Sequence, residues 1–477
     1  MPFLISLGVL LLSLFAIVLV RTLRFVPQKR KPRTIEKIAV DLDRAAQELS
    51  ELIKCRTVSN KNPDLEDARE FERMPQVLAK LFPAVHRTMT LEMPSDRSLL
   101  FRWRGEGDGA PTVIMAHYDV VSADESAWTR PAFEGVVDNG FLYGRGALDT
   151  KLTLSTALHA AERLITEGFV PKNDVYFAFG GDEEISGKGA VAIVDLFERR
   201  GIYPSLVLDE GGAVVKGIFP GVKRSAALIG IAEKGMADVA YVAKSSGGHA
   251  STPKGHTPVT RLARAATRVI SHPFPFRLTE PTKLMLDRVT RHSTFGYRMI
   301  FGNLWLFAPV LNLITREGGE LGAIVRTTVA FTEMHGAYGT NVIPPEASLV
   351  SNQRILPGET PESVREHLER AVADREVDVS ILSAQPPSRV SCVKCAEYEK
   401  IEETAQEVWQ NAVVAPYLML ACSDSRHWGR ISDRVYCFSP MEFVGDERAS
   451  IHGNDERVSL SSIEKSVEFF YRFIKKI

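Results

Sequence analysis

The chain begins with a run of apolar residues, 3–20, that contains no charged side chain. A helix of this length is about long enough to cross the hydrocarbon core of a bilayer. Basic residues follow the run directly, beginning with Arg21 and Arg24. The pattern predicts a hydrophobic membrane anchor over 1–26 and a basic linker over 27–34.

A cleaved signal peptide and a buried core helix are the alternatives for this segment. A signal peptide carries its basic residues first and ends in a small-x-small cleavage site, whereas Leu19, Val20 and Arg21 occupy that place here. An uncleaved anchor is therefore the preferred interpretation. The basic flank on the C-terminal side favours a cytoplasmic enzyme by the positive-inside rule, although the side of the membrane stays open.

Beyond the linker, apolar positions recur at helical spacing, and short apolar runs then alternate with helix-like stretches. This alternation predicts an α/β sheet with helices on both faces. The expected helices are 35–54, 66–82, 151–167 and 187–200, and the expected strands are 98–103, 112–116, 174–179 and 205–208.

A second block of elements starts near residue 228 and ends before Pro386 and Pro387. We expect it to be an inserted domain, 228–388, within a catalytic domain made of 35–227 and 389–477. Its expected strands are 236–244, 323–332, 346–355 and 377–383, and its expected helices are 257–270 and 361–373.

Composition narrows the function only slightly. The 477 residues suggest two packed units. Lys plus Arg number 58 and Asp plus Glu 59, a balance that gives no support for a nucleic-acid partner. The five cysteines are few and odd in number, which argues against a disulfide framework.

Four short polar motifs stand where the predicted strands end. In open α/β sheets, ligands bind beyond the carboxyl ends of the strands, so the four motifs predict one common site. The motifs are MAHYDVV with His117 and Asp119, GRGALDTK with Asp149, GGDEEISG with Glu183 and Glu184, and LDEGG with Asp209.

Each motif also has an ordinary structural explanation when it is taken alone. Asp149 would serve as a helix cap, the LDEGG segment as a turn, and the Glu-Glu pair as a solvated helix start. Their recurrence in order, each flanked by glycine and preceded by a strand, favours a functional site.

The chemistry of such a cluster points to metal ions. Neighbouring carboxylates repel one another unless cations neutralise them, and imidazole with carboxylate suits Zn²⁺. A carboxylate that bridges two ions holds them close enough for hydrolysis. In the His117-x-Asp119 pair, the carboxylate can accept the second N–H of a ligand imidazole and fix its tautomer.

These motifs, in this order and followed by SIHGNDERV, resemble the co-catalytic zinc family of carboxypeptidase S, aminoacylase-1, glutamate carboxypeptidase, acetylornithine deacetylase and succinyl-diaminopimelate desuccinylase. The resemblance covers 117–454 and is strongest to carboxypeptidase S and the N-fatty-acyl-amino acid hydrolase/synthase. It implies a mixed-sheet zinc-peptidase catalytic domain with an inserted α+β lid or dimerisation domain. It also implies two Zn²⁺ ions per subunit and a homodimer in some members.

The resemblance further implies a role for each motif residue. His117 and Asp209 would bind one zinc ion, Glu184 and His452 the other, and Asp149 would bridge them. Glu183 would be the general base that takes a proton from the metal-bound water and passes it to the leaving amine. Asp119 would orient His117. Spacing alone does not distinguish Glu183 from Glu184.

Four further residues match the family less strictly. His249, in GGHASTP, would donate to the oxyanion of the tetrahedral intermediate, in dimeric members from the neighbouring subunit. Asn341, Arg354 and Arg426 are candidates for substrate binding, because an arginine grips a carboxylate with two parallel hydrogen bonds. A surface salt bridge is the alternative for each arginine.

The activity that follows is hydrolysis of the amide bond of a C-terminal amino acid in a peptide, or of an N-acyl amino acid. Two alternatives are reversible synthesis and hydrolysis of N-fatty-acyl amino acids, and a non-catalytic membrane-bound relative. The aromatic and apolar stretch 295–314 is expected either to line a pocket for a hydrophobic acyl chain or to form the core of the inserted domain.

Overall fold

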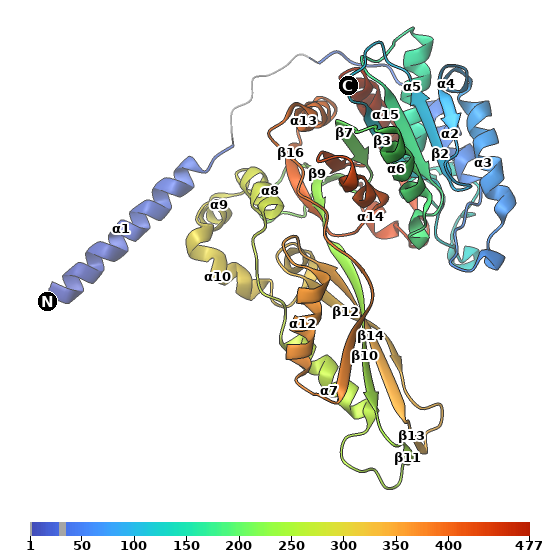
Figure 1. Cartoon of the computed structure of the whole chain (residues 1–477). Helices are drawn as coiled ribbons and strands as arrows, with labels where there is room; N and C mark the ends of the chain where they lie inside the picture. The colour runs from blue at the N-terminus through green and yellow to red at the C-terminus, as the bar shows by residue number, and fades with distance from the viewer. Residues whose placement is uncertain (1, 28–34) are drawn as a thin grey trace.

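The computed structural model describes residues 2–27 and 35–477, so nearly all of the predicted linker lies outside the described residues. Figure 1 shows a projecting N-terminal helix, a large α/β unit and an elongated smaller unit. The projecting helix is α1 (Pro2–Arg24). Among the described residues it is the one helix that is long and apolar enough to span a bilayer unbent.

The large unit is built on a mixed sheet in the order β1-β2-β6-β3-β7-β17-β9-β16, with β8 paired to β9. The central strands β6, β3, β7 and β17 run parallel to one another. The bounds are β1 (Thr90–Glu92), β2 (Ser98–Trp103), β3 (Thr112–His117), β6 (Val175–Gly180), β7 (Leu206–Asp209), β8 (Val214–Val215), β9 (Ala226–Glu233), β16 (Val413–Met419) and β17 (Val435–Cys437).

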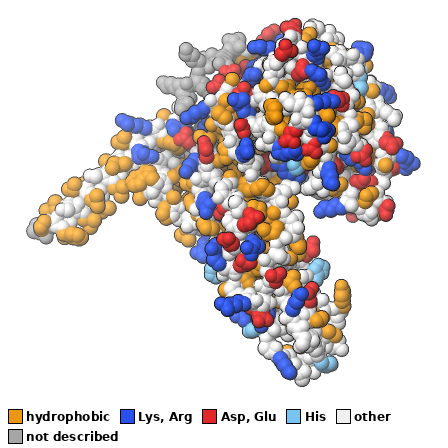
Figure 2. All heavy atoms as spheres, in the orientation of Figure 1, with side chains coloured by type: hydrophobic (Ala, Val, Ile, Leu, Met, Phe, Trp, Pro, Cys, Tyr) orange, Lys and Arg blue, Asp and Glu red, His pale blue; other side chains and the backbone are white. Residues whose placement is uncertain are grey.

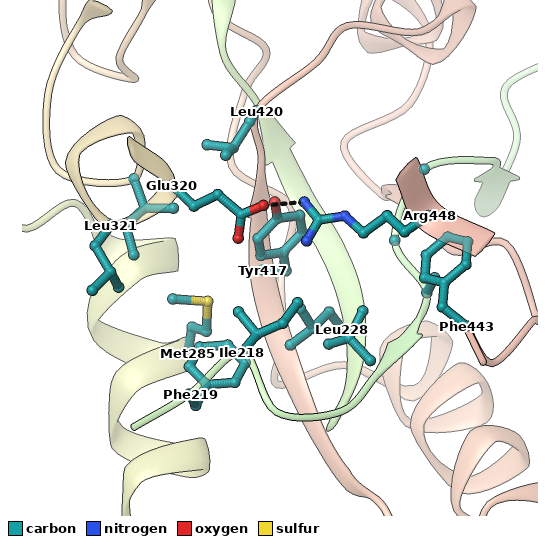
Figure 3. Close-up of a pocket in the computed structure, with 15 residues that line it drawn as sticks. Ile218, Phe219, Leu228, Met285, Glu320, Leu321, Tyr417, Leu420, Phe443 and Arg448 are labelled. Carbon is teal, nitrogen blue, oxygen red and sulfur yellow. Dashed lines mark ion pairs between the residues drawn. The ribbon is translucent and has the colours of Figure 1, made fainter. Parts of the chain in front are cut away.

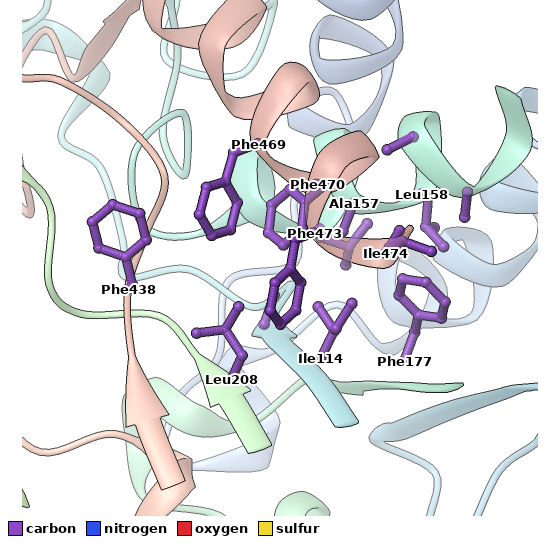
Figure 4. Close-up of a cluster of buried hydrophobic side chains, with 14 of the residues drawn as sticks. Ile114, Ala157, Leu158, Phe177, Leu208, Phe438, Phe469, Phe470, Phe473 and Ile474 are labelled. Atoms are coloured by element: carbon purple, nitrogen blue, oxygen red, sulfur yellow. The ribbon is translucent and has the colours of Figure 1, made fainter. Parts of the chain in front are cut away.

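Helices cover both faces of this sheet, as the sequence predicts. Every residue of β3 and β6 is buried, as expected for strands packed on both sides. On one face, α15 places Phe470 and Phe473 over the central strands (Figure 4). The helices of the unit are α2 (Leu42–Ile53), α3 (Ala68–Leu81), α4 (Pro83–Thr88), α5 (Lys151–Thr166), α6 (Gly189–Arg200), α13 (Ala396–Val408), α14 (Glu447–Ser450) and α15 (Leu460–Ile474).

Most predicted elements of the large unit are confirmed to within a few residues. The exception is the helix expected from residue 35, which begins only at Leu42 because Asp41 caps it by accepting a hydrogen bond from the Arg44 N–H. A small sheet, β18-β5-β4, lies beside the main one. It consists of β4 (Val136–Asp138), β5 (Phe141–Tyr143) and β18 (Arg457–Ser459).

The smaller unit is a four-stranded antiparallel sheet, β12-β14-β10-β15, with α7 and α12 packed against it. Buried and half-exposed residues alternate along β14, the pattern of a sheet with one solvated face. The bounds are β10 (Gly235–Lys244), β12 (Thr328–His335), β14 (Glu346–Ile355), β15 (Val377–Gln385), α7 (Pro258–Ser271) and α12 (Pro361–Val372). A two-stranded ribbon, β11 (Gly248–His249) with β13 (Val342–Ile343), forms its outer tip (Figure 1).

The elements of the expected insertion, 228–388, do not all lie in the smaller unit. The chain crosses into the smaller sheet between β9 and β10, so the first residues of this range belong to the large sheet. Between the strands of the smaller sheet, the chain also returns to pack on β9 and β16. The returning helices are α8 (Glu280–Thr290), α9 (Phe295–Phe301), α10 (Leu304–Ile314) and α11 (Gly319–Ala323).

Candidate metal centre

His117 ends β3, and its imidazole lies at the centre of the polar cluster. Its Nδ1 lies 3.0 Å from the backbone oxygen of Asp119 and 3.3 Å from the Asp119 carboxylate. Its Nε2 lies 3.0 Å from Asp149 Oδ1 and 3.4 Å from Glu210 Oε1. A proton on Nδ1 therefore leaves the Nε2 lone pair facing two carboxylates, the arrangement of a ligand histidine.

Asp119 also holds the Glu-Glu turn in place. Its fully buried carboxylate accepts hydrogen bonds from the backbone N–H groups of Glu183 and Glu184 and from the Ser59 hydroxyl. The turn η3 (Glu183–Ile185) follows β6 directly. One aspartate thus links the imidazole of His117 to the backbone that carries both glutamates.

The two carboxylate oxygens of Asp149 face two different imidazoles. Oδ1 lies 3.0 Å from His117 Nε2, and Oδ2 lies 3.1 Å from His452 Nε2. The same His452 nitrogen lies 3.1 Å from Glu184 Oε1. His452, which comes from far along the chain, adopts a left-handed φ of 58°. This is the geometry of a carboxylate that bridges two ligand sets.

Glu456 holds the Asp149 loop, a role that the sequence analysis missed. Its fully buried carboxylate accepts hydrogen bonds from the backbone N–H groups of Gly146, Leu148 and Asp149 and from the Arg145 guanidinium. The N–H groups of a loop that converge on one carboxylate fix the loop's backbone. The GRGALD motif is therefore positioned by an acid four residues after His452.

The sequence alone does not show which acid of the LDEGG motif meets the imidazole. In the structure, Asp209 Oδ2 accepts hydrogen bonds from the Ser423 hydroxyl and the Ser425 N–H. The next residue, Glu210, faces the His117 imidazole instead. Glu210 is therefore a candidate ligand that the sequence analysis did not name, and the role of Asp209 stays a prediction.

The electrostatics of the cluster favour cations. Burial and neighbouring acids raise the pKa of Glu210 to about 8 and the pKa of Asp209 to about 6. Burial also raises the pKa of Glu183 well above its ordinary range. Hydrogen bonds to Asp149 and Glu184 raise the pKa of His452 to about 10. Carboxylates held this close repel one another, and a bound metal ion would neutralise their negative charge.

The donor set fits two divalent ions. Ligand atoms of His117, Asp149 and Glu184 lie within 4.8 Å of one another, as do those of His117, Glu183 and Glu210. Imidazole nitrogen and carboxylate oxygen are donors that suit Zn²⁺. Asp149 lies between His117 and His452, so it contacts the imidazoles of both ligand sets.

Two of the predicted substrate residues, Arg426 and Arg354, lie beside Cys422. Arg426, on the turn η4 (Asp424–Arg430), is largely buried, and its Nε has no hydrogen-bond partner among the described residues. Arg354, on β14, donates to Cys422 Sγ at 3.6 Å. Burial raises the pKa of the Cys422 thiol, and the positive charges of Arg354 and Arg426 act to lower it. Ser423 and Ser425, which hold Asp209, therefore also anchor the segment that carries Arg426.

His249 and Asn341 lie elsewhere. His249 belongs to β11, and the Asn341 carbonyl accepts a hydrogen bond from the Ala250 N–H beside it. Both occupy the tip of the smaller unit, at the end remote from the large sheet (Figure 1). Within one chain, the structure does not bring them to the metal cluster.

An apolar cavity begins directly after Glu210. It holds about 600 Å³ of empty space, part of it open to solvent, and Gly211 and Gly212 form part of its wall. Figure 3 shows Phe219, Leu228 and Met285 lining the space below the ion pair of Glu320 and Arg448. The stretch 295–314 contributes no residue to this lining, although Phe301 and Leu304 pack against the hydrophobic cluster beside it, so its role as a pocket wall stays a prediction.

Comparison with known protein families identifies the chemistry to which this geometry belongs. The family model described as peptidase family M20/M25/M40 matches residues 113–476. The probable carboxypeptidase S-like 2 of Dictyostelium discoideum is 32% identical, over 98% of this chain and 92% of its own length. The N-fatty-acyl-amino acid synthase/hydrolase PM20D1 of Mus musculus is 33% identical, over 84% of this chain and 81% of its own length.

Solved structures share the fold. The M20 family metallo-carboxypeptidase Sso-CP2 of Sulfolobus solfataricus superposes with a TM-score of 0.66, covering 90% of this chain and 98% of its own. The two sequences are 18% identical. The mixed-sheet peptidase fold predicted from the motifs is therefore confirmed.

Proposed function

Because the chain belongs to peptidase family M20/M25/M40, an enzyme family of metallopeptidase and amidohydrolase type, we propose that it is a two-zinc amidohydrolase. Its substrates would be N-acyl amino acids or peptides that end in a free carboxylate. The observation that carries the proposal is the position of Asp149, whose two oxygens face His117 and His452.

We assign the ligands from the contacts of each imidazole. His117 and Glu210 would hold one zinc ion, and His452 and Glu184 the other. Asp149 would bridge the pair. Zinc ions held there would polarise the scissile carbonyl and lower the pKa of a bound water.

Glu183 is the group best placed to move the proton. Its carboxylate lies in the same group of ligand atoms as His117 and Glu210, and its backbone N–H is held by Asp119. A carboxylate fixed in this way would take a proton from the attacking water and deliver it to the leaving amine.

The substrate requires two further contacts. Among the described residues the Nε of Arg426 has no hydrogen-bond partner, so this guanidinium, with Arg354 also beside Cys422, suits the free carboxylate of an amino acid. The apolar cavity after Glu210 suits a hydrophobic acyl or side-chain group. The name of the PM20D1 relative specifies a fatty-acyl substrate and includes synthesis as well as hydrolysis. We therefore keep the reverse reaction as a second candidate that uses the same residues.

We further propose that two copies of the chain complete each site. His249 and Asn341 lie on the outer tip of the smaller unit and are remote from their own metal cluster. In a homodimer, this tip would reach the partner's cluster, where His249 would donate to the oxyanion.

The deciding experiment measures release of free amino acid by the purified full chain. The panel would hold N-acetyl, N-octanoyl and N-oleoyl amino acids and blocked dipeptides. We expect release that disappears with a chelator, returns with zinc and is absent in Glu183→Ala. Release that survives the chelator, or persists in the variant, would refute the proposal.

A further inference from the structure

The C-terminal half of α1 is docked on the folded enzyme. The amide nitrogen of Asn303, which lies between α9 and α10, donates to the Val18 carbonyl and to the Thr22 hydroxyl. Its amide oxygen accepts a hydrogen bond from Arg21 Nε at 3.2 Å. Asn303 and Thr22 are both fully buried. Loss of α1 would uncover a polar side chain whose donors and acceptor are matched to that helix.

The helices that receive α1 expose an unusual amount of apolar surface. We call α9 and α10 together the elbow, because their axes differ by 100° at Gly302 and Asn303. Most side chains of the elbow are exposed or half-buried, and α10 carries no charged residue. Its largely exposed apolar side chains are Phe295, Tyr297, Trp305, Val310, Leu313 and Ile314.

The length and the bend of the elbow limit how deeply it could enter a bilayer. The 11 residues of α10 extend for only about 16 Å at the rise of an α-helix, about half of the hydrocarbon thickness of a bilayer. The bend prevents α9 and α10 from forming one straight span. Val310, Leu313 and Ile314 follow the three- and four-residue spacing of one helix face. An uncharged face of this size can enter one leaflet without crossing it.

We propose that α1 is retained as a bilayer anchor and that the elbow inserts beside it into the same leaflet, with Trp305, Leu313 and Ile314 among the lipids. The apolar surface runs from α1 onto the region where the elbow lies next to it (Figure 2). The basic residues Arg21, Arg24 and Arg298 flank this surface and suit lipid headgroups. The inference rests on these contacts and not on the metal chemistry.

Trp305 is a built-in reporter for the test. It is 55% exposed, whereas the other four tryptophans, at 103, 128, 409 and 428, are at most 8% exposed. The full chain would be reconstituted in dioleoylphosphatidylcholine vesicles with or without bromine on the acyl chains. The fluorescence of Trp305 is the difference between the native chain and Trp305→Phe.

We expect brominated lipid to quench most of the Trp305 emission, and aqueous acrylamide to quench little of it. Quenching by acrylamide alone would place Trp305 in water and overturn the proposal. Protection from both quenchers would assign the surface to a protein partner, such as a second copy, and would also overturn it. Mass spectrometry of the mature chain tests retention separately, because removal of α1 refutes the anchor.

Two further variants separate lipid contact from folding. Leu313→Asp with Ile314→Asp should shift the Trp305 emission to longer wavelength and open it to acrylamide, while α1 keeps the chain on the vesicles. Leu382→Asp places one carboxylate at a 61% exposed site on β15 and should change neither reading. Equal behaviour of the two variants would contradict the proposal.

Discussion

The Oε1 atom of Glu210 lies 3.4 Å from the Nε2 atom of His117, on the imidazole nitrogen that also faces Asp149. The preceding Asp209 makes no such contact and instead binds Ser423 and Ser425. Two adjacent acids of one motif thus have different partners, and we expect them to have different tasks.

Glu210→Gln and Asp209→Asn should therefore differ in metal content. We expect Glu210→Gln to retain about one zinc ion per chain after dialysis, because one ligand set loses its carboxylate. Asp209→Asn should keep both ions and lower the melting temperature, since a buried acceptor of two hydrogen bonds is altered. Elemental analysis with thermal unfolding distinguishes them, and the reverse pattern would restore Asp209 as the ligand.

Glu183→Gln should separate catalysis from metal binding. The amide keeps the size of the side chain but cannot accept the proton, so kcat should fall by about 10²–10⁴-fold. Zinc content should stay at the level of the native chain, since Glu183 is not one of the proposed ligands. Loss of zinc together with activity would instead make Glu183 a ligand.

Metal affinity should rise with pH. Without metal, the pKa of His452 is raised to about 10 by its hydrogen bonds to Asp149 and Glu184. A proton must therefore leave the imidazole before it binds zinc, and competition by protons is strongest at low pH. Competitive chelator titrations from about pH 6 to about pH 10 cover the ordinary and the raised pKa of His452. They should show tighter zinc binding at each higher pH. His452→Ala should flatten that slope.

The stability of the metal-free chain should change in the opposite direction. A raised pKa means that the folded state holds its proton more tightly than the unfolded state. The contribution of His452 is complete below the unfolded value of 6.5 and is lost as the pH rises through about 10. Denaturant unfolding of the metal-free protein at several pH values measures this loss, and a pH-independent result for this residue would contradict it.

Glu456→Gln should destabilise the fold as well as the site. Glu456 and Arg145 form a buried ion pair with an N–O distance of 2.7 Å, and breaking such a pair costs about 3–5 kcal/mol. The Asp149 loop also loses an acceptor for its N–H groups. Urea unfolding gives the change in free energy. Asp433→Asn is the matched control, because its pair with Arg389 is exposed and should contribute about 0–1 kcal/mol.

Leu228→Trp should shorten the acyl chain that the enzyme accepts. Leu228 lies on β9 and lines the apolar cavity after Glu210, so a larger ring would occupy space meant for substrate. Each methylene excluded from such a site costs about 0.8 kcal/mol, so KM for N-octanoyl substrates should rise roughly tenfold or more. N-acetyl substrates should be unaffected. An equal loss for both would indicate a damaged site rather than a filled cavity.

The sequence by itself determined the local elements and the chemistry class. Strands β3 and β6 are buried on both faces, and such strands are apolar along their whole length. They can therefore be recognised in the sequence without knowing which strands pair with them. Motifs at strand ends share one edge of the sheet by geometry alone. For these reasons, His117 and the Glu-Glu pair could be grouped before any contact was known. Asp149 follows β5 of the small sheet, so only the order of the motifs pointed to it.

Only the tertiary structure decided which acid faces the imidazole, what holds the Asp149 loop and which side chains of the stretch 295–314 are exposed. Asp209 and Glu210 are adjacent, so the sequence alone does not show which of them contacts His117. Glu456 meets the Asp149 loop across about 300 residues of chain. Neither relationship leaves a local signal, because packing between distant segments creates it. Likewise, the exposed apolar side chains of the elbow can be identified only in the folded structure, because their exposure depends on which residues the neighbouring elements cover.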